Sequence, residues 1–247
     1  MPEREELIGA MAGVKARVRR RVEDAVDRII RVVWQYRSAE FSFDGDPELD
    51  AEVNAILTAM SDGNMRDARE AALRLLELLD YDAWVAESFE WASRGRDSQG
   101  ALFRLDMHAS HLKDLLAGWM VVAAVLGLTE AALRSEIFKT LSNPFASEAW
   151  RKAGLSPLSW GRGYARDVIE GMTVVCQDFI NASYQYAKVR SFVGTGAIGY
   201  RTERNSNYDC KYCDDMTKKV WPLDEVVLPY HPRCVCIPVP VYENETI

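Results

Sequence analysis

The sequence predicts a mainly α fold: a body of several helices that begins with a long N-terminal helix, followed by a small C-terminal α+β module built on a β-hairpin. Two observations carry this prediction. Through roughly the first 195 residues, apolar side chains recur at spacings of three and four, the period of an amphipathic helix. Beyond that point glycines and prolines gather, and short stretches alternate as strands do.

The N-terminal helix is predicted from a single apolar stripe. A helix of about 35 residues would be roughly 50 Å long at 1.5 Å per residue. The stripe consists of Leu7, Met11, Val14, Val18, Val22, Ala25, Ile29 and Val32. We interpret the arginines in the middle of this helix as a solvated or salt-bridged face, with contact to an acidic partner or DNA as the alternative. These are Arg17, Arg19, Arg20 and Arg21.

Capping residues and prolines mark the helices that follow. Asp46 caps and Pro47 opens the second helix, Ser61 or Asp62 caps the third, and Thr129 caps a later one. The predicted helices cover residues 47–60, 62–80, 82–93, 97–126, 129–141 and 160–192. Breaks at Asn143-Pro144 and Ser156-Pro157 flank a further short helix.

The character of the chain changes at a glycine hinge formed by Gly194, Gly196 and Gly199. Residues 200–202 read as a short strand. Residues 235–242 alternate like an edge strand whose prolines prevent a full ladder. We therefore predict a helical domain over residues 1–195 and a separate module over residues 196–247.

Composition is that of an ordinary soluble protein, with 48% hydrophobic and 27% charged residues. The net charge of −7 argues against bulk electrostatic binding to nucleic acid. The charged N-terminus is not that of a signal peptide. The longest apolar run, residues 115–128, is shorter than the roughly 20 residues that span a bilayer, so we expect a buried helix and no stable membrane insertion. We expect synthesis in a reducing cytoplasm, where clustered cysteines bind metal more often than they form disulfides.

Five metal-binding side chains are concentrated in 27 residues near the C-terminus: Cys210, Cys213, His231, Cys234 and Cys236. Thiolates and imidazole paired at two-residue spacing are the ligands of tetrahedral Zn²⁺. Only four can bind one such ion. The spacing favours the first four, with Cys236 as a substitute ligand or a thiol beside the site.

We therefore predict one Zn²⁺ per chain with a structural role, because a closed four-ligand site leaves no open position for catalysis. A module of about 50 residues with few large apolar side chains also needs such a support. Two disulfides, unrelated core cysteines or a redox pair at Cys210 and Cys213 are the alternatives. Cys176, the fifth cysteine, lies by itself on a helix.

The order of these residues resembles the C-terminal signature of phage Mu F-like head-morphogenesis (minor capsid) proteins. That signature has a CxxC knuckle, a hairpin similar to Leu-Asp-Gly-Lys-Val-Phe, and His-Pro-x-Cys-Arg-Cys before a proline-spaced strand. It differs here at Thr217-Lys218, where the family tends to have Asp-Gly, and at Val235, where it usually has Arg. The matching segments are Tyr200-Arg201-Thr202, Cys210-Lys211-Tyr212-Cys213, Met216-Thr217-Lys218-Lys219-Val220-Trp221-Pro222-Leu223-Asp224-Glu225 and Pro229-Tyr230-His231-Pro232-Arg233-Cys234-Val235-Cys236.

The resemblance covers about 45 residues and implies a phage or prophage virion component. Such proteins act structurally in head or procapsid assembly at the portal vertex, without turnover, and can be delivered with the DNA. The implied partners are the portal, capsid and scaffolding proteins, with phage DNA through the arginines at 17–21 as a further partner. The implied location is the virion, in the capsid interior or at the portal vertex, after assembly in the bacterial cytoplasm.

Two other classes compete with this interpretation. His108 and His111 lie three residues apart on one predicted helix, with Asp114 following, and such a set could form the metal site of an enzyme. A zinc-finger-type interaction module is the other class. A DNA-binding form would need a basic recognition helix beside the knuckle, where Lys218 and Lys219 stand among acidic residues.

Overall fold

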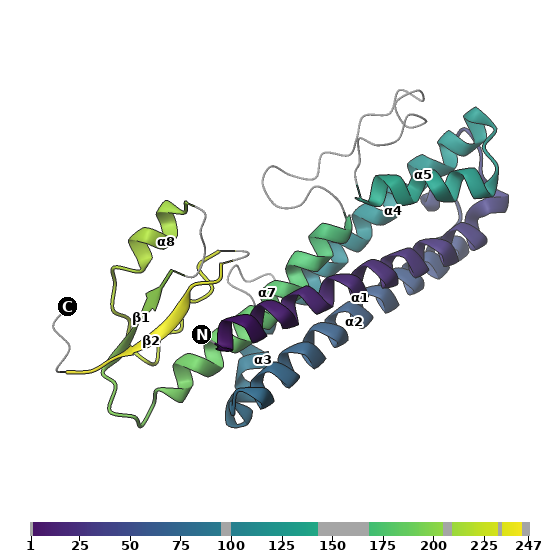
Figure 1. Cartoon of the computed structure of the whole chain (residues 1–247). Coiled ribbons are helices and arrows are strands. Elements are labelled where there is room, and N and C mark those ends of the chain that lie inside the picture. The colour runs from purple at the N-terminus through teal and green to yellow at the C-terminus, as the bar shows by residue number, and fades with distance from the viewer. Residues whose placement is uncertain (1, 95–99, 143–167, 205–208, 232–233, 244–247) are drawn as a thin grey trace. The chain divides into compact units, whose positions relative to one another are not determined.

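The computed structural model describes residues 2–94, 100–142, 168–204, 209–231 and 234–243. This part of the chain is mainly helical with a small two-stranded antiparallel sheet near the C-terminus, as predicted (Figure 1). The helices are α1 (Pro2–Val33), α2 (Pro47–Leu78), α3 (Val85–Arg94), α4 (Ala101–Leu126), α5 (Glu130–Ser142), α7 (Val168–Ser191) and α8 (Lys211–Met216).

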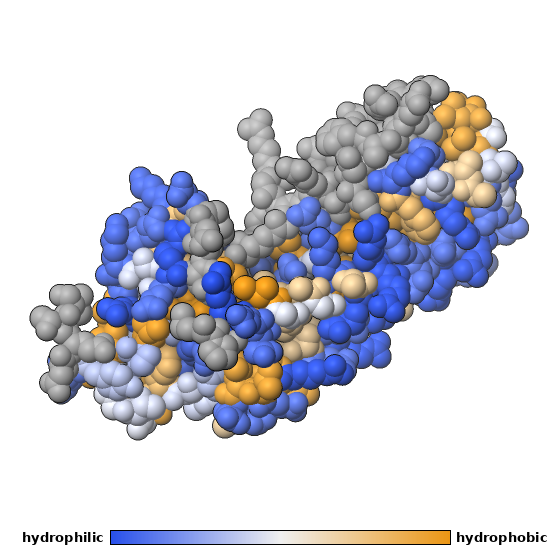
Figure 2. Space-filling view, viewed as in Figure 1, coloured by the Kyte–Doolittle hydropathy of each residue, from blue (hydrophilic) through white to orange (hydrophobic). Residues whose placement is uncertain are grey.

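The chain groups into two compact units that share several of the long helices. One comprises Met1–Val14, Arg66–Ala101 and Cys176–Ile247, and the other Lys15–Met65 and Leu102–Val175. The boundary near residue 195 falls inside the first unit, and the division at 195 stays a prediction. The visible face in Figure 2 is largely hydrophilic, with smaller hydrophobic patches between.

The apolar stripe of α1 is confirmed. The helix has 32 residues, and every predicted member of its stripe except Val32 is buried. The chain then passes through two short 3₁₀ turns at Trp34–Tyr36 and Phe43–Gly45. Asp46 Oδ1 accepts the backbone N–H groups of Glu48 and Leu49, so the predicted cap before Pro47 is present.

The predicted interruption near residue 61 is wrong, because α2 runs unbroken from Pro47 to Leu78. Neither Ser61 nor Asp62 caps a helix. Ser61 and Asn64 are fully buried. The Asn64 amide contacts the Met172 sulfur, 3.5 Å away. Gly63 leaves room for Arg21, whose guanidinium would lie 2.5 Å from a Cβ at that position. These polar and small residues therefore serve helix packing, which overrides their local preference for a helix end.

The other predicted helices differ mainly at their ends. The helix predicted for 82–93 begins as a 3₁₀ turn, Asp82–Trp84, before α3. Thr129 Oγ1 accepts the N–H of Ala132, which confirms the cap of α5. The helices predicted for 97–126 and 160–192 correspond to α4 and α7. The breaks at Asn143-Pro144 and Ser156-Pro157, the short helix between them and the start of the last helix lie outside the described residues.

Helix α4 is, among the described residues, the one helix long and apolar enough to cross a membrane by length and composition. In this structure 44% of its apolar window is buried, and Leu105, Leu112 and Trp119 are fully covered. Core helices of soluble proteins meet the same criterion. The absence of stable membrane insertion therefore stays a prediction.

The sheet pairs β1 (Gly199–Glu203) with β2 (Ile237–Val241) in antiparallel register, so that Tyr200 lies opposite Pro240. The two strands are joined by the long segment 204–236, which carries α8, and not by a tight turn. Gly194 and Gly196, in the predicted hinge before β1, have φ values of 86° and 87°, which favour glycine.

Tyr200 exchanges backbone hydrogen bonds with Trp221, on the side of β1 away from β2. Tyr200 and Pro240 therefore form a non-hydrogen-bonded pair of the ladder, as do Thr202 and Pro238. The nitrogen atoms of both prolines consequently lie on the outer edge of β2, where a proline has no hydrogen to donate. This confirms the predicted edge strand and explains why two prolines are tolerated in it.

A polar cluster ties the start of α1 to the end of α7 within the first unit. The Glu3 carboxylate accepts hydrogen bonds from the Tyr81 and Tyr184 hydroxyls, each at 3.2 Å, and pairs with Lys188. Burial opposes ionisation of Glu3, but Lys188 and the two tyrosines outweigh it and lower the pKa of the carboxyl group. Burial and the Glu3 charge raise the pKa of both tyrosines, which stay neutral donors.

We predict that Glu3→Gln lowers the free energy of unfolding at pH 7 by about 1–2 kcal/mol, because it leaves Lys188 without its anion. Since the folded pKa of Glu3 lies below its ordinary value of 4.5, the stabilisation is complete above that value and disappears as pH falls through the folded pKa. Urea titrations at pH 7 and at acid pH measure both effects. The exposed Glu5→Gln is the control, and equal stability of Glu3→Gln and parent at pH 7 would contradict the prediction.

Candidate metal centre

The first arm of the C-terminal cluster is a knuckle at the start of α8. Cys210 caps this short helix, and its sulfur accepts the N–H of Cys213 at 3.4 Å. Arg204 pairs with Asp214 and donates to the Cys210 carbonyl at 3.3 Å. The two-residue gap therefore turns both sulfurs toward one point and fixes the backbone around them.

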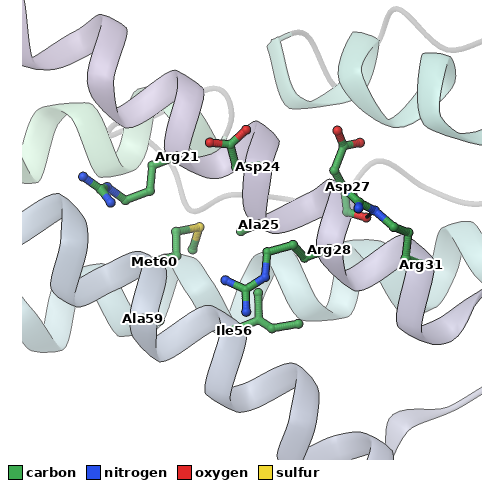
Figure 3. Close-up of a pocket in the computed structure, with 9 residues that line it drawn as sticks. All are labelled: Arg21, Asp24, Ala25, Asp27, Arg28, Arg31, Ile56, Ala59 and Met60. Carbon is green, nitrogen blue, oxygen red and sulfur yellow. Dashed lines mark hydrogen bonds between the residues drawn. The ribbon is translucent and has the colours of Figure 1, made fainter.

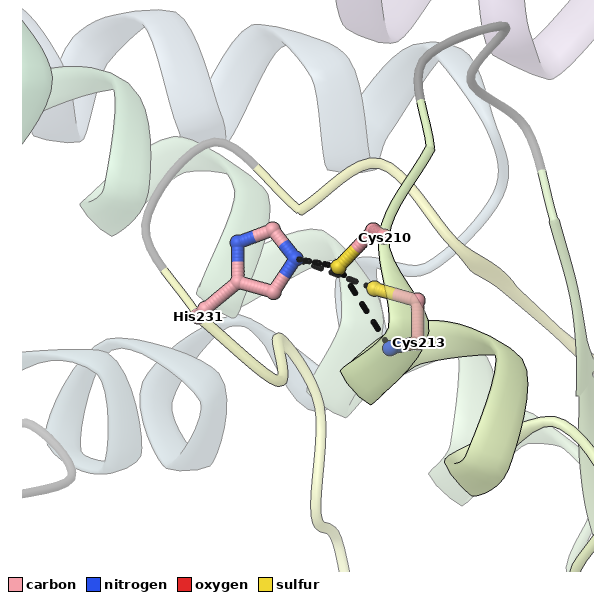
Figure 4. A group of neighbouring side chains, drawn as sticks. All are labelled: Cys210, Cys213 and His231. Carbon is pink, nitrogen blue, oxygen red and sulfur yellow. Dashed lines mark hydrogen bonds between the residues drawn. The ribbon is translucent and has the colours of Figure 1, made fainter.

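The second arm returns at His231. Its Nε2 atom lies 3.3 Å from the sulfur of Cys210 and 3.0 Å from the sulfur of Cys213 (Figure 4). A backbone hydrogen bond from Cys234 N to the His231 carbonyl, 3.0 Å long, turns the chain so that Cys234 follows on the same arm. The Cys234 sulfur lies 3.8 Å from that of Cys213.

All five predicted ligands are brought together, in two overlapping groups. Cys210, Cys213 and His231 form one group, and Cys213, Cys234 and Cys236 form the other, so Cys213 belongs to both. Each group could hold a metal ion. None of the described cysteines is in a disulfide, and Cys176 is buried on α7. The alternative of two disulfides is therefore not what this structure shows.

Hydrogen bonds favour the thiolate at one cysteine of each arm. The thiol of Cys236 and the backbone N–H groups of Cys236 and Tyr230 lower the pKa of Cys234. The N–H of Cys213 lowers the pKa of Cys210. The Cys236 thiol donates a hydrogen bond to the Cys234 sulfur, and this bond, together with burial, raises the pKa of Cys236. Burial, followed by the charge of Cys234, raises the pKa of Cys213. A site with two ready thiolates suits a cation.

An apolar shell covers the buried side of the cluster. Cys213, Cys234 and Cys236 have at most 1% of their surface exposed. The shell includes Val189 of α7 and Phe192, the first residue after that helix, so the core of the module continues onto α7. Inside it, Tyr200 donates to the Glu225 carbonyl at 2.9 Å and accepts from Val227 N at 3.1 Å. The hydroxyl groups of Thr202 and Tyr230 meet at 2.7 Å. This packing excludes water from the three thiols.

Two residues of α7, Asn181 and Gln185, contact this site and were missed from the sequence. The Asn181 amide donates to the carbonyl of Cys234, and the Gln185 amide donates to the carbonyl of Cys236 at 2.7 Å. Both amides are fully buried. The feature that could have identified them is a pair of amide side chains four residues apart on a helix with few exposed positions.

Among the residues that the structure describes, His108 and His111, the alternative metal site predicted from the sequence, do not converge with other metal-binding side chains as the cysteines do. The two rings meet edge to face with centroids 6.3 Å apart. Within the described residues, neither histidine belongs to a group of three or more potential metal ligands. His108 is buried against Gly171 of α7, where a Cβ would lie 2.4 Å from the ring. Burial, then the charges of His111 and Arg104, lower the pKa of His108 to about 4. His108 is therefore neutral at pH 7 and packs in a core.

No protein-family model, curated protein or solved structure matches the chain.

We predict that Gly171→Ala destabilises the protein by about 1–3 kcal/mol, although alanine favours a helix over glycine, because the new methyl group overlaps the His108 ring. In the His108→Ala background, Gly171→Ala should lower the free energy of unfolding by much less. Urea titration of the four proteins gives the coupling energy.

The control is Gly13→Ala, at an exposed helical glycine with no neighbouring atom within 4 Å of the added Cβ. It should be neutral or stabilising. Equal costs of Gly171→Ala in both backgrounds would show that the two side chains do not pack as described.

Proposed function

We propose that the C-terminal cluster binds one structural Zn²⁺ per chain. Two sulfurs bound to a tetrahedral zinc at about 2.3 Å lie about 3.8 Å apart, and a sulfur and an imidazole nitrogen lie about 3.6 Å apart. The distance between the Cys213 and Cys234 sulfurs is 3.8 Å. The distances from His231 Nε2 to the first two sulfurs, 3.0 and 3.3 Å, are slightly shorter than this ideal.

The ligand set best supported is Cys210, Cys213, His231 and Cys234, since the short distances between their ligand atoms join these four through Cys213. Cys236 then lies beside the metal as a hydrogen-bond donor to Cys234. Four protein ligands close the coordination sphere, so the ion would crosslink the two arms and leave no position for a substrate. This supports a non-enzymatic role.

We further propose that the protein is a minor head protein of a phage or prophage, acting structurally in head assembly at the portal vertex. The observation that carries this proposal is the ordered set from residue 200 to 242: strand, knuckle, Trp221 segment, His-Pro-Arg-Cys-Val-Cys and proline-spaced strand. Within this set, the strand and the Trp221 segment pair, and the five ligands converge. The partners would be the portal, capsid or scaffolding proteins, and the location the virion after assembly in the bacterial cytoplasm.

A groove in the second unit supports DNA as an additional partner. It lies between α1 and α2 and has a volume of about 400 Å³ (Figure 3). Arg21, Arg28 and Arg31 line it, together with Asp24 and Asp27. Asp27 pairs with Arg134 at 3.1 Å, so its charge is already compensated.

The basic charge extends along α1 beyond the groove. Residues 15–37 carry eight basic and three acidic side chains, although the chain as a whole is acidic. Seven of the eight are arginines, whose guanidinium groups match phosphate oxygens in pairs. A local basic face of this kind is compatible with a net charge of −7, because contacts between charges beyond about 10 Å are screened.

We predict about one zinc per chain by elemental analysis of protein purified without chelator. Cys213→Ser should lose the metal and expose residues 200–242 to proteolysis, while far-UV circular dichroism changes little because the helices have their own apolar cores. Cys176→Ser, at a buried thiol of α7 outside the cluster, should keep both metal and protection. Full metal content in Cys213→Ser, or an oxidised cluster without metal in the parent, would reject the zinc proposal.

The head-assembly role predicts that the chain co-sediments with procapsids when it is co-expressed with the portal and scaffolding proteins encoded beside it. Binding should persist in the Arg28→Glu/Arg31→Glu variant, whereas retention of DNA by the purified chain should fall at least tenfold. Arg94→Glu, on α3, is the matched charge-reversal control.

Failure to co-purify with particles, together with metal-dependent hydrolysis by the purified chain, would favour the enzyme alternative. Equal loss of DNA retention in the Arg94→Glu control would instead reject the groove as the DNA contact.

A further inference from the structure

The buried amides of Asn181 and Gln185 form a ladder along the segment before β2 that carries the last two cysteines. Asn181 Nδ2 donates to the Cys234 carbonyl. Gln185 Nε2 donates to the Cys236 carbonyl at 2.7 Å and to Asn181 Oδ1 at 3.1 Å. Both hydrogens of the Gln185 amide are thus used, and the two side chains act as one unit.

The spacing of the ladder follows from the geometry of its two elements. Residues four apart on a helix are separated by about 6 Å along its axis. Residues two apart in an extended chain are separated by about 6.6 Å. The amides at 181 and 185 therefore meet the carbonyls at 234 and 236 in register. A helix interior has no free backbone N–H, so side-chain amides are the donors that α7 can offer.

The carbonyl groups of Cys234 and Cys236 need this partner. The β1–β2 ladder begins at Ile237, which pairs with Glu203, so neither cysteine has a partner strand in that sheet. Both residues are buried, and an unsatisfied buried carbonyl costs about 1–3 kcal/mol. The amides satisfy both groups and at the same time fix the backbone from which the two thiols project.

We propose that Asn181 and Gln185 are the positioning residues of the metal centre, which hold the second arm so that Cys234 meets Cys213. This inference rests on the proposed zinc site. The first arm is ordered locally, by the cap of α8 and by Arg204, whereas the second arm has no helix or strand at Cys234 and Cys236 and is held by α7. The centre thus belongs jointly to the C-terminal segment and to a helix about 50 residues earlier in the chain.

The test compares Asn181→Leu and Gln185→Met, which keep side-chain size and remove the donors. Zinc affinity, measured by competition with a chromogenic chelator, should fall about tenfold to hundredfold in each. The double variant should bind zinc only slightly more weakly than the single variant with the lower affinity, because the two amides hold the same segment. The matched control is Ser183→Ala, at a buried α7 hydroxyl that donates to its own helix at Phe179 and should bind zinc like the parent.

A second measurement does not depend on zinc. Metal-free protein lacks the zinc crosslink, but the two amides still bind the backbone at Cys234 and Cys236. In the reduced, metal-free state, alkylation of these two thiols by iodoacetamide should therefore be at least tenfold faster in the variants than in the parent, with Cys176 unchanged as internal reference. Unchanged zinc affinity and unchanged labelling in both variants would overturn the proposal, as would equal weakening by Ser183→Ala. If the parent binds no zinc, the zinc proposal fails. The alkylation rates alone then decide whether the amides position the segment that carries Cys234 and Cys236.

Discussion

The Cys213 thiol is the point on which the C-terminal module depends, since it contacts both arms of the cluster and lies in the module's core. Its sulfur meets the His231 ring and the Cys234 sulfur, and its backbone N–H holds Cys210. The strands β1 and β2 have five residues each, and a two-stranded sheet is only marginally stable by itself. Residues 204, 209–231 and 234–236, the described part of the segment between them, have little regular structure beyond α8. The order of the module therefore comes from the convergence of its two arms and from the surface of α7 beneath them.

Helix α7 serves two purposes at once. Its apolar side chains pack in the core, and from residue 168 to 187 only Glu170, Gln177 and Tyr186 are not buried. Its polar side chains have two kinds of partner. Ser183 and Thr173 bond within the helix, whereas Asn181 and Gln185 bond to the backbone of Cys234 and Cys236. A buried polar residue on such a helix can therefore either bond only to its own helix or hold the backbone of a segment that is distant in the sequence.

The sequence predicted what depends on local spacing. The stripe of α1 and the caps at Asp46 and Thr129 follow from the helical period and from side chains that reach their own backbone. The approach of the five metal-binding side chains also followed from two-residue gaps on two arms. Contacts between distant segments could not be predicted in this way. Ser61 resembled a helix cap because its burial against other helices is invisible locally, and Asn181 lies 53 residues from its partner Cys234.

The two prolines of β2 have a consequence for how copies of this protein meet. Strand exchange or the addition of a foreign strand needs alternating donors and acceptors along an open edge. At positions 238 and 240 that edge offers carbonyl oxygens without N–H groups, so an incoming strand would find half of its hydrogen bonds missing. The sheet is therefore capped at two strands on this side. Many chains could accumulate side by side in a cell without this strand becoming the seed of a growing β-fibre.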